Sequence, residues 1–149
     1  MSSPRELLNA AKAVITEIDP HEVAANISHY TLLDVREPDE YEQGAVPGAV
    51  HIPRGNLEFS VEGRIQDKNA PLAVYCAGGV RSAFATKTLQ DIGYTNVVSI
   101  IGGFNKWKDE GLTWATPQTM TSQQRIQYHR HLLLRRHGLW RGQIGRAHV

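Results

Sequence analysis

The sequence predicts an α/β fold: a central, mostly parallel, five-stranded sheet with helices on both faces, followed by a C-terminal helical tail. Three observations lead to this prediction. Five short apolar segments alternate with helical segments along the chain. These apolar segments are continuous rather than alternating with polar residues, which is typical of parallel strands buried on both faces. The 149 residues, 41% of them hydrophobic, suit one domain with an appendage.

The first expected element is an N-terminal helix over residues 1–12. Ser3 and Glu6 have the spacing of a capping box, and the proline after Ser3 occupies the first helical position, where its missing N–H costs nothing. The next two helices also begin at a capping residue followed by proline, at Asp19 and at Glu37. Local chemistry therefore marks the first three helix starts.

The strands are compact apolar segments bounded by turn residues. Apolar residues at helical spacing mark a later helix that ends at Gly93, and Gly102-Gly103 turn the chain into the last helix. We assign residues 13–114 to the α/β domain and residues 115–149 to a basic helical tail. In chain order the expected elements of the domain are strand 13–18, helix 19–25, strand 31–35, a helix from 37 that stops at Gly44, strand 50–52, strand 72–75, helix 82–92, strand 96–101 and helix 104–110.

Composition excludes several classes of function. A formal net charge of +1 argues for neither nucleic acid nor a membrane surface as a partner. A single cysteine excludes an internal disulfide and a multi-cysteine metal site. The first residues lack the apolar core of a signal peptide, and no apolar run approaches membrane-spanning length. We therefore expect a reducing, cytoplasmic setting in which a free thiol stays functional.

That single cysteine, Cys76, lies between the strand 72–75 and the helix 82–92. At this position the N–H groups and dipole of the following helix stabilise a thiolate, and Arg81 places a guanidinium nearby. An isolated cysteine on an apolar strand is more often an inert core residue, so the surrounding loop decides the interpretation. The sequence therefore predicts a reactive cysteine.

The loop Ala77-Gly78-Gly79-Val80-Arg81 has the composition of an anion-binding cup. A loop this short must curl, so that successive N–H groups turn inward around the sulfur. The two glycines permit positive φ angles and close approach, and the guanidinium can form two hydrogen bonds to an oxyanion. The loop contains no histidine or aspartate to act as a general base, so activation must come from the cup itself.

Four motifs in the same order give the chain a resemblance to single-domain rhodaneses, which are thiosulfate or persulfide sulfurtransferases. The resemblance covers residues 13–114. The motifs are Asp34-Val35-Arg36-Glu37 with Glu40-Tyr41, Gly44-Ala45-Val46-Pro47-Gly48-Ala49-Val50-His51-Ile52-Pro53, Cys76-Ala77-Gly78-Gly79-Val80-Arg81-Ser82, and Gly102-Gly103 with Trp107 and Gly111.

The resemblance implies a mechanism. Cys76 attacks the outer sulfur of a small donor such as thiosulfate, becomes a persulfide, and passes the sulfur to cyanide, a thiol or a protein acceptor. The amides of Ala77 to Arg81 hold the persulfide, and Arg81 helps to bind the anionic donor. Asp34, Arg36 and Ser82 support the loop rather than react; the alternative for Asp34 and Arg36 is a structural ion pair or turn anchor without a role at the site. The covalent persulfide takes the place of a cofactor, so no metal or organic cofactor is implied.

One residue departs from the family pattern. The family usually has histidine after Gly44, whereas this chain has Ala45. We expect this change to affect local packing more than activity.

Two other functions compete with sulfur transfer. Cysteine phosphatases use a similar cup, but with five residues between cysteine and arginine; here there are four, and position 82 is Ser82 rather than arginine. The smaller ring suits a sulfur atom better than a phosphate. The other alternative is a binding module without turnover, against which the presence of Cys76 argues.

The tail, rich in basic residues and histidine over 121–148, carries a second resemblance. Residues 128–134, with Gly138 and Gly142-Gln143 after them, resemble the opening of adenylyltransferases that activate ubiquitin-like sulfur carriers, here as a truncated start. This second resemblance implies a ubiquitin-like sulfur carrier as acceptor. Thiosulfate, a cysteine-desulfurase persulfide and glutathione persulfide all suit the small cationic cup as donors. The apolar residues 132–134 need cover, which predicts either packing of the tail on the domain or self-association through the tail. The histidines lack a common face and a nearby carboxylate, so no metal site is expected.

Overall fold

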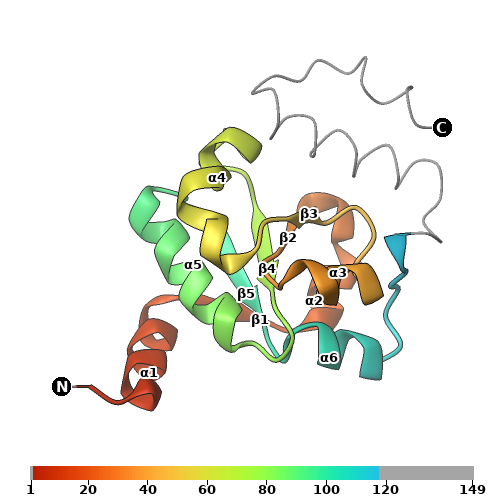
Figure 1. The fold of residues 1–149 in the computed structure, drawn as a ribbon, viewed down its shortest axis with the longest axis horizontal. Coiled ribbons are helices and arrows are strands. Elements are labelled where there is room, and N and C mark those ends of the chain that lie inside the picture. Colours follow the sequence, from red (N-terminus) through yellow and green to blue (C-terminus); the bar gives the residue numbers. More distant parts are fainter. Residues whose placement is uncertain (1, 118–149) are drawn as a thin grey trace.

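In the computed structural model, which describes residues 2–117, five strands form one sheet in the order β1-β5-β4-β2-β3 (Figure 1). Every strand pairs with its neighbour in parallel. The strands are β1 (Thr16–Ile18), β2 (Thr31–Asp34), β3 (Val50–His51), β4 (Leu72–Tyr75) and β5 (Val97–Ile100). The predicted α/β fold with a five-stranded parallel sheet is therefore confirmed.

Helices connect the strands and lie against both faces of the sheet. The α-helices are α1 (Pro4–Val14), α2 (Pro20–Ala25), α3 (Pro38–Gln43), α4 (Leu57–Arg64), α5 (Val80–Ile92) and α6 (Gly103–Asp109), and the 3₁₀ turns are η1 (Ile27–His29) and η2 (Arg54–Asn56). Figure 1 shows α4 and α5 on one side of the sheet and α2, α3 and α6 on the other. Parallel strands need such crossovers, and the helices shield both faces from water.

Two apolar cores result, one on each face. Alternate residues of β4 point to opposite sides: Val74 and Cys76 join the core beneath α4 and α5, while Ala73 and Tyr75 join the core beneath α2 and α6. All four side chains are buried. Cys76, the residue after β4, is therefore enclosed by apolar side chains. It can be approached only from the loops at the C-terminal end of the strand.

Local signals placed most elements correctly. Helix α1 runs from Pro4 to Val14 rather than over residues 1–12, so β1 begins at Thr16 and not at residue 13; two further differences are informative. Ser3 and Glu6 form the capping box reciprocally at the start of α1. Helix α5 begins at Val80, two residues earlier than expected, because Gly79 adopts a left-handed conformation (φ +106°) and caps the helix there. Helix α4 was not predicted; its sequence shows little separation of polar and apolar residues, and tertiary packing of Leu57 and Val61 holds it in place.

The predictions for the tail and for membrane-spanning segments can be compared with the structure only over residues 2–117. The tail and its proposed resemblance fall almost wholly on residues 118–149, outside the described residues. Within residues 2–117, no helix combines the length and apolar character needed to cross a membrane.

Candidate active site

The site forms where the C-terminal ends of two neighbouring strands meet. Asp34 of β2 is in register with Tyr75 of β4, and the amide of Val35 donates to the Tyr75 carbonyl at 3.1 Å. Cys76 follows directly and is 1% exposed. In parallel α/β sheets, loops beyond the carboxyl ends of the strands carry the ligand-binding groups. The topology therefore brings residues 34–36 and the cysteine loop to the same edge of the sheet.

The sulfur of Cys76 lies at the N-terminus of α5. The backbone N–H groups of Gly79 and Ser82 donate to Sγ at 3.1 and 3.3 Å, and the Ser82 hydroxyl lies 3.5 Å from it. Since the first amides of a helix have no intrahelical partner and carry the positive end of its dipole, they favour an anionic sulfur.

The loop differs in detail from the predicted cup. Of the two glycines, Gly79 alone has a positive φ; Gly78 does not need its conformational freedom. The Ser82 amide, which the prediction left outside the cup, contacts the sulfur directly. Gly78 is exposed and Val80 is half exposed, so both lie at the rim. The early start of α5 explains the shift, because it replaces part of the expected loop with a helix turn.

A second hydroxyl supports Ser82 from the neighbouring strand. Ser99 of β5 donates from Oγ to Ser82 Oγ at 2.9 Å, and both residues are fully buried. Because Ser82 Oγ then accepts a hydrogen bond, its own hydrogen is available to an ionised Sγ. The site predicted from the sequence does not include Ser99. The available signal was a serine inside an otherwise apolar strand, which requires a buried partner.

Helix α6 holds the other side of the loop. The amide of Phe104 donates to the Cys76 carbonyl at 2.7 Å, and the amide of Asn105 donates to the Ala77 carbonyl at 3.0 Å. Gly103, at φ +59°, makes this approach possible, since a Cβ there would lie 2.5 Å from the Cys76 oxygen and 2.6 Å from the Ala77 oxygen. The sequence indicated only a turn at this glycine; the structure shows that it also lets α6 orient the loop.

The guanidinium of Arg81 is already engaged in an ion pair rather than available to a donor in the cup. Its two terminal nitrogens donate to the two carboxylate oxygens of Glu40 on α3, at 2.8 and 2.9 Å. These hydrogen bonds from Arg81 lower the pKa of Glu40 from 4.5 to about 2, and those to Glu40 raise the pKa of Arg81. The arginine predicted to bind an anionic donor is thus paired with a carboxylate of its own chain.

This ion pair is expected to make stability depend on pH in the acid range. The pKa of Glu40 is about 2 in the folded protein and 4.5 ordinarily, so its stabilisation is complete above about pH 5 and is lost as pH falls through about 2. The difference in thermal unfolding midpoint between wild type and Glu40→Gln should therefore be small at neutral pH, since the pair is partly exposed, and narrow on acidification. A difference that stays constant down to about pH 2 would contradict this.

Asp34 and Arg36 form a buried ion pair beside the loop. The Arg36 guanidinium donates to both Asp34 oxygens, at 3.0 and 2.7 Å, and to the Gly44 carbonyl at 2.6 Å. Burial lowers the pKa of Arg36, but the hydrogen bonds and charge of Asp34 outweigh it, so the pKa is raised overall. The guanidinium carbon lies 4.3 Å from the centre of the Phe104 ring. Arg36 therefore reaches the cysteine loop through Phe104, whose amide holds the Cys76 carbonyl.

Ala45, where the family usually has histidine, is fully buried. Its N–H and C=O pair with Ala115 at 2.9 and 3.0 Å, and it packs with Tyr41. The backbone of this position joins the end of the domain to the segment after β2. Nothing in these contacts involves Cys76.

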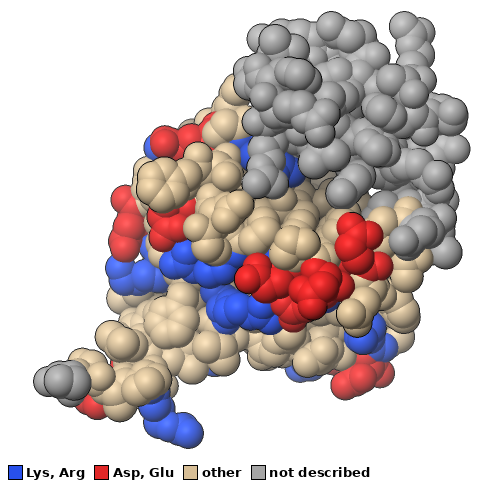
Figure 2. Space-filling model, viewed as in Figure 1, with Lys and Arg blue, Asp and Glu red and all other residues tan. Residues whose placement is uncertain are grey.

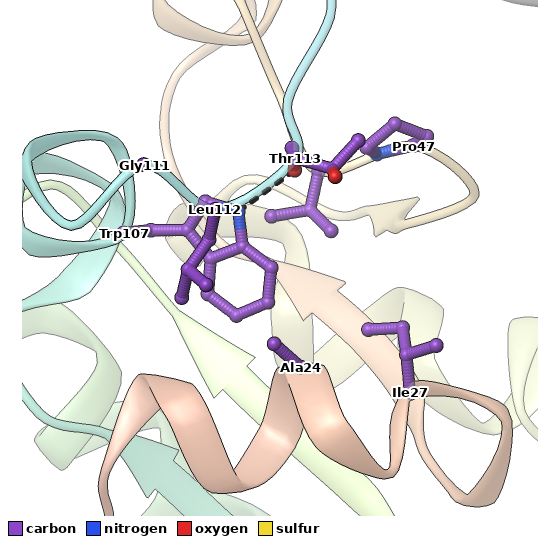
Figure 3. Close-up of a pocket in the computed structure, with 8 residues that line it drawn as sticks. Ala24, Ile27, Pro47, Trp107, Gly111, Leu112 and Thr113 are labelled. Carbon is purple, nitrogen blue, oxygen red and sulfur yellow. Dashed lines mark hydrogen bonds between the residues drawn. The ribbon is translucent and has the colours of Figure 1, made fainter.

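A separate pocket of about 420 Å³ lies between α2, α6 and the segment at Pro47 (Figure 3). Ala24, Ile27 and Trp107 line it, and the Trp107 indole N–H donates to the Thr113 carbonyl at 2.8 Å, across one wall. No residue of the cysteine loop lines this pocket. Among residues 2–117, no cluster of three or more His, Cys, Asp or Glu side chains could hold a metal ion.

Comparison with known proteins agrees with this geometry. The sequence pattern of the rhodanese-like domain matches residues 19–110. The thiosulfate sulfurtransferase GlpE of Coxiella burnetii is 37% identical over 78 residues, which are 52% of this chain and 70% of GlpE.

Two solved structures are also similar. A Rhodopseudomonas palustris protein of unknown function, described as a possible tyrosine phosphatase, is 33% identical with a TM-score of 0.71, covering 76% of this chain and 94% of its own. The polysulfide-sulfur transferase homodimer of Wolinella succinogenes is 32% identical with a TM-score of 0.65, covering 74% and 85%. The chain therefore belongs to the rhodanese-like domain family.

Proposed function

We propose that this protein is a sulfurtransferase in which Cys76 accepts a sulfane sulfur as a persulfide and passes it on. The observation that carries the proposal is the sulfur at the N-terminus of α5, held by the amides of Gly79 and Ser82. A relative of known name, a thiosulfate sulfurtransferase, supports the reaction class. No residue of the loop 77–81 supplies a general base, so in this proposal the N-terminus of α5 stabilises the Cys76 thiolate.

The reaction then has two steps. The Cys76 thiolate attacks the outer sulfur of the donor, a new S–S bond forms, and the donor's own bond to that sulfur breaks. With thiosulfate the leaving group is sulfite, and the dianionic charge of thiosulfate leaves with it. An attacking thiophile such as cyanide or a thiolate next takes the outer sulfur, and Cys76 returns as a thiolate.

The physiological acceptor follows from the tail rather than the site. The resemblance of residues 128–134 to sulfur-carrier adenylyltransferases favours a ubiquitin-like sulfur carrier as acceptor. A cysteine desulfurase is the protein donor that suits the cup, in the cytoplasm, where a free thiol stays reduced. The corresponding assay is formation of a carrier thiocarboxylate from the loaded protein and a carrier activated as its acyl adenylate, with AMP as the leaving group and an added thiol to cleave the intermediate acyl disulfide. If the loaded protein transfers sulfur to small thiols but to no carrier, the proposed acceptor is wrong while the proposed chemistry of Cys76 stands.

A phosphatase is the competing enzyme, because one structural relative is described as a possible tyrosine phosphatase. A phosphate needs the arginine fork that Glu40 occupies here and a longer loop than the four residues between Cys76 and Arg81. We therefore expect no hydrolysis of an aryl phosphate under conditions that load the cysteine with sulfur.

The test is the intact mass of the protein after incubation with thiosulfate or a small persulfide and removal of excess reagent. A gain of one sulfur atom, located to the peptide that contains Cys76 and reversed by cyanide or dithiothreitol, supports the proposal. Failure to gain sulfur from either donor, with the protein folded, overturns it in favour of a binding module.

Loss of the Ser99 hydroxyl is expected to slow persulfide formation about fivefold, the effect of one lost neutral hydrogen bond. Ser99 acts through Ser82 and does not touch the donor, so Ser99→Ala should lower the rate at saturating donor and leave the half-saturating donor concentration unchanged. Stopped-flow measurement of the loading step separates the two quantities. Ser99→Thr keeps a hydroxyl on β5 and should restore the rate; equal rates in Ser99→Ala and Ser99→Thr would contradict the role.

A further inference from the structure

We propose that Glu40 determines which sulfur donors the site accepts: by neutralising Arg81, it disfavours dianions such as free thiosulfate and favours donors whose outer sulfur is carried by a group of low charge. This inference rests on the proposed sulfurtransferase function. It concerns the choice of donor and does not alter the role of Cys76.

The ion pair with Glu40 weakens the attraction of Arg81 for any further anion. Both terminal nitrogens of its guanidinium are bonded to Glu40, at 2.8 and 2.9 Å, in the bidentate arrangement that is the strongest such pair. Glu40 also accepts the amide of Glu37 at 2.9 Å, which fixes the carboxylate at the start of α3. The low pKa of Glu40, about 2, means that the carboxylate stays charged at neutral pH. The pair is thus neutral as a whole.

Helix α3, which carries Glu40, adds further negative charge. Helix α3 carries further carboxylates at Asp39 and Glu42, with Glu37 at its cap, all exposed. Figure 2 shows acidic side chains gathered over α3, next to basic side chains. A free dianion that approaches Arg81 meets the carboxylate of Glu40 and the nearby charge of Glu37, while the guanidinium that would bind it is already paired. Coulomb repulsion from each unpaired carboxylate is twice as large for a dianion as for a monoanion.

A donor of low charge avoids this cost. A persulfide carried on a thiol bears at most one negative charge on its sulfurs, one fewer than thiosulfate, and it reacts with a nucleophile through its protonated form, R–S–SH. The Cys76 thiolate attacks the outer sulfur, the S–S bond of the donor breaks, and the carrier leaves as R–S⁻ while the proton remains on the new Cys76 persulfide. The α5 amides that hold Sγ require no arginine for this step. The site therefore suits a thiol-borne persulfide, on a small molecule or on a protein.

The test compares two donors that have the same reacting bond and differ by one charge: thiosulfate, a dianion, and methanethiosulfonate, a monoanion. The second-order rate constant for loading Cys76 is measured with each, in wild type and in Glu40→Gln. Glutamine can still accept the Glu37 amide, so the start of α3 is kept. In Glu40→Gln we expect the rate constant to rise about tenfold with thiosulfate. The electrostatic free energy is half as large for a monoanion, so the rise with methanethiosulfonate should be the square root of that, about threefold. Both gains should shrink as ionic strength rises.

Glu42→Gln is the matched control. It removes the same charge from the same helix, and among the ion pairs of residues 2–117 Glu42 takes no part. We expect less than a twofold change for either donor. Equal gains for the two donors in Glu40→Gln, or a gain as large in Glu42→Gln, would overturn the inference while the sulfurtransferase function stands. Absence of loading by both donors in every variant would instead overturn the proposed function itself.

Discussion

Cys76→Ser is expected to abolish sulfur loading completely. In the proposed reaction the Cys76 thiolate is the nucleophile, and a serine hydroxyl at the same place remains protonated because the loop supplies no general base. Serine has nearly the same size and still accepts the amides of Gly79 and Ser82, so the fold should persist. Intact mass after donor treatment checks the loss, and the thermal unfolding midpoint checks the fold. A mass gain retained in Cys76→Ser would place the sulfur elsewhere.

Ser82→Ala provides the graded comparison. It removes the hydroxyl 3.5 Å from Sγ but keeps the backbone N–H that donates to the sulfur. The loading rate is therefore expected to fall about fivefold rather than to zero, the effect of one neutral hydrogen bond. Complete loss in Ser82→Ala with an unchanged unfolding midpoint would give the hydroxyl a role in proton transfer that the helix-terminus mechanism does not assign to it.

Gly103→Ala is expected to slow loading by about 10²-fold and to lower the thermal unfolding midpoint. The new Cβ would lie 2.5 Å from the Cys76 carbonyl oxygen and 2.6 Å from that of Ala77, and both are backbone atoms that cannot move aside without moving the loop. Separating α6 from the loop breaks the bonds from the Phe104 and Asn105 amides, at 2.7 and 3.0 Å. The sulfur would then lose its fixed place at the α5 terminus.

Gly111→Ala separates this collision from backbone strain. Gly111 has a similar left-handed φ of +74°, but a Cβ there meets no atom within 4 Å. The substitution should therefore cost about 1 kcal/mol of stability and leave the loading rate unchanged. If Gly103→Ala and Gly111→Ala lower the rate equally, contact between α6 and the loop is not what positions Cys76.

The fold and the centre of the site could be predicted because their signals are local. Each strand is a short apolar segment, and the helix starts at Ser3 and Glu37 are marked by residues within four positions. The sulfur and the amide of Gly79 are three residues apart, so a strand, a glycine and a helix in sequence already place them together. Helix α4 escaped prediction because packing, rather than a periodic pattern, stabilises it.

The sequence by itself determined the α/β class, the position of Cys76 between a strand and a helix, and the family resemblance, since each rests on neighbouring residues. Only the tertiary structure decided what surrounds the sulfur. Ser99 reaches Ser82 across 17 residues, and Glu40 reaches Arg81 across 41. Such pairs depend on which strands and helices become neighbours, and a buried hydroxyl or an occupied arginine leaves no mark on the residues beside it. Long-range packing therefore set the charge and the hydrogen bonds of the site.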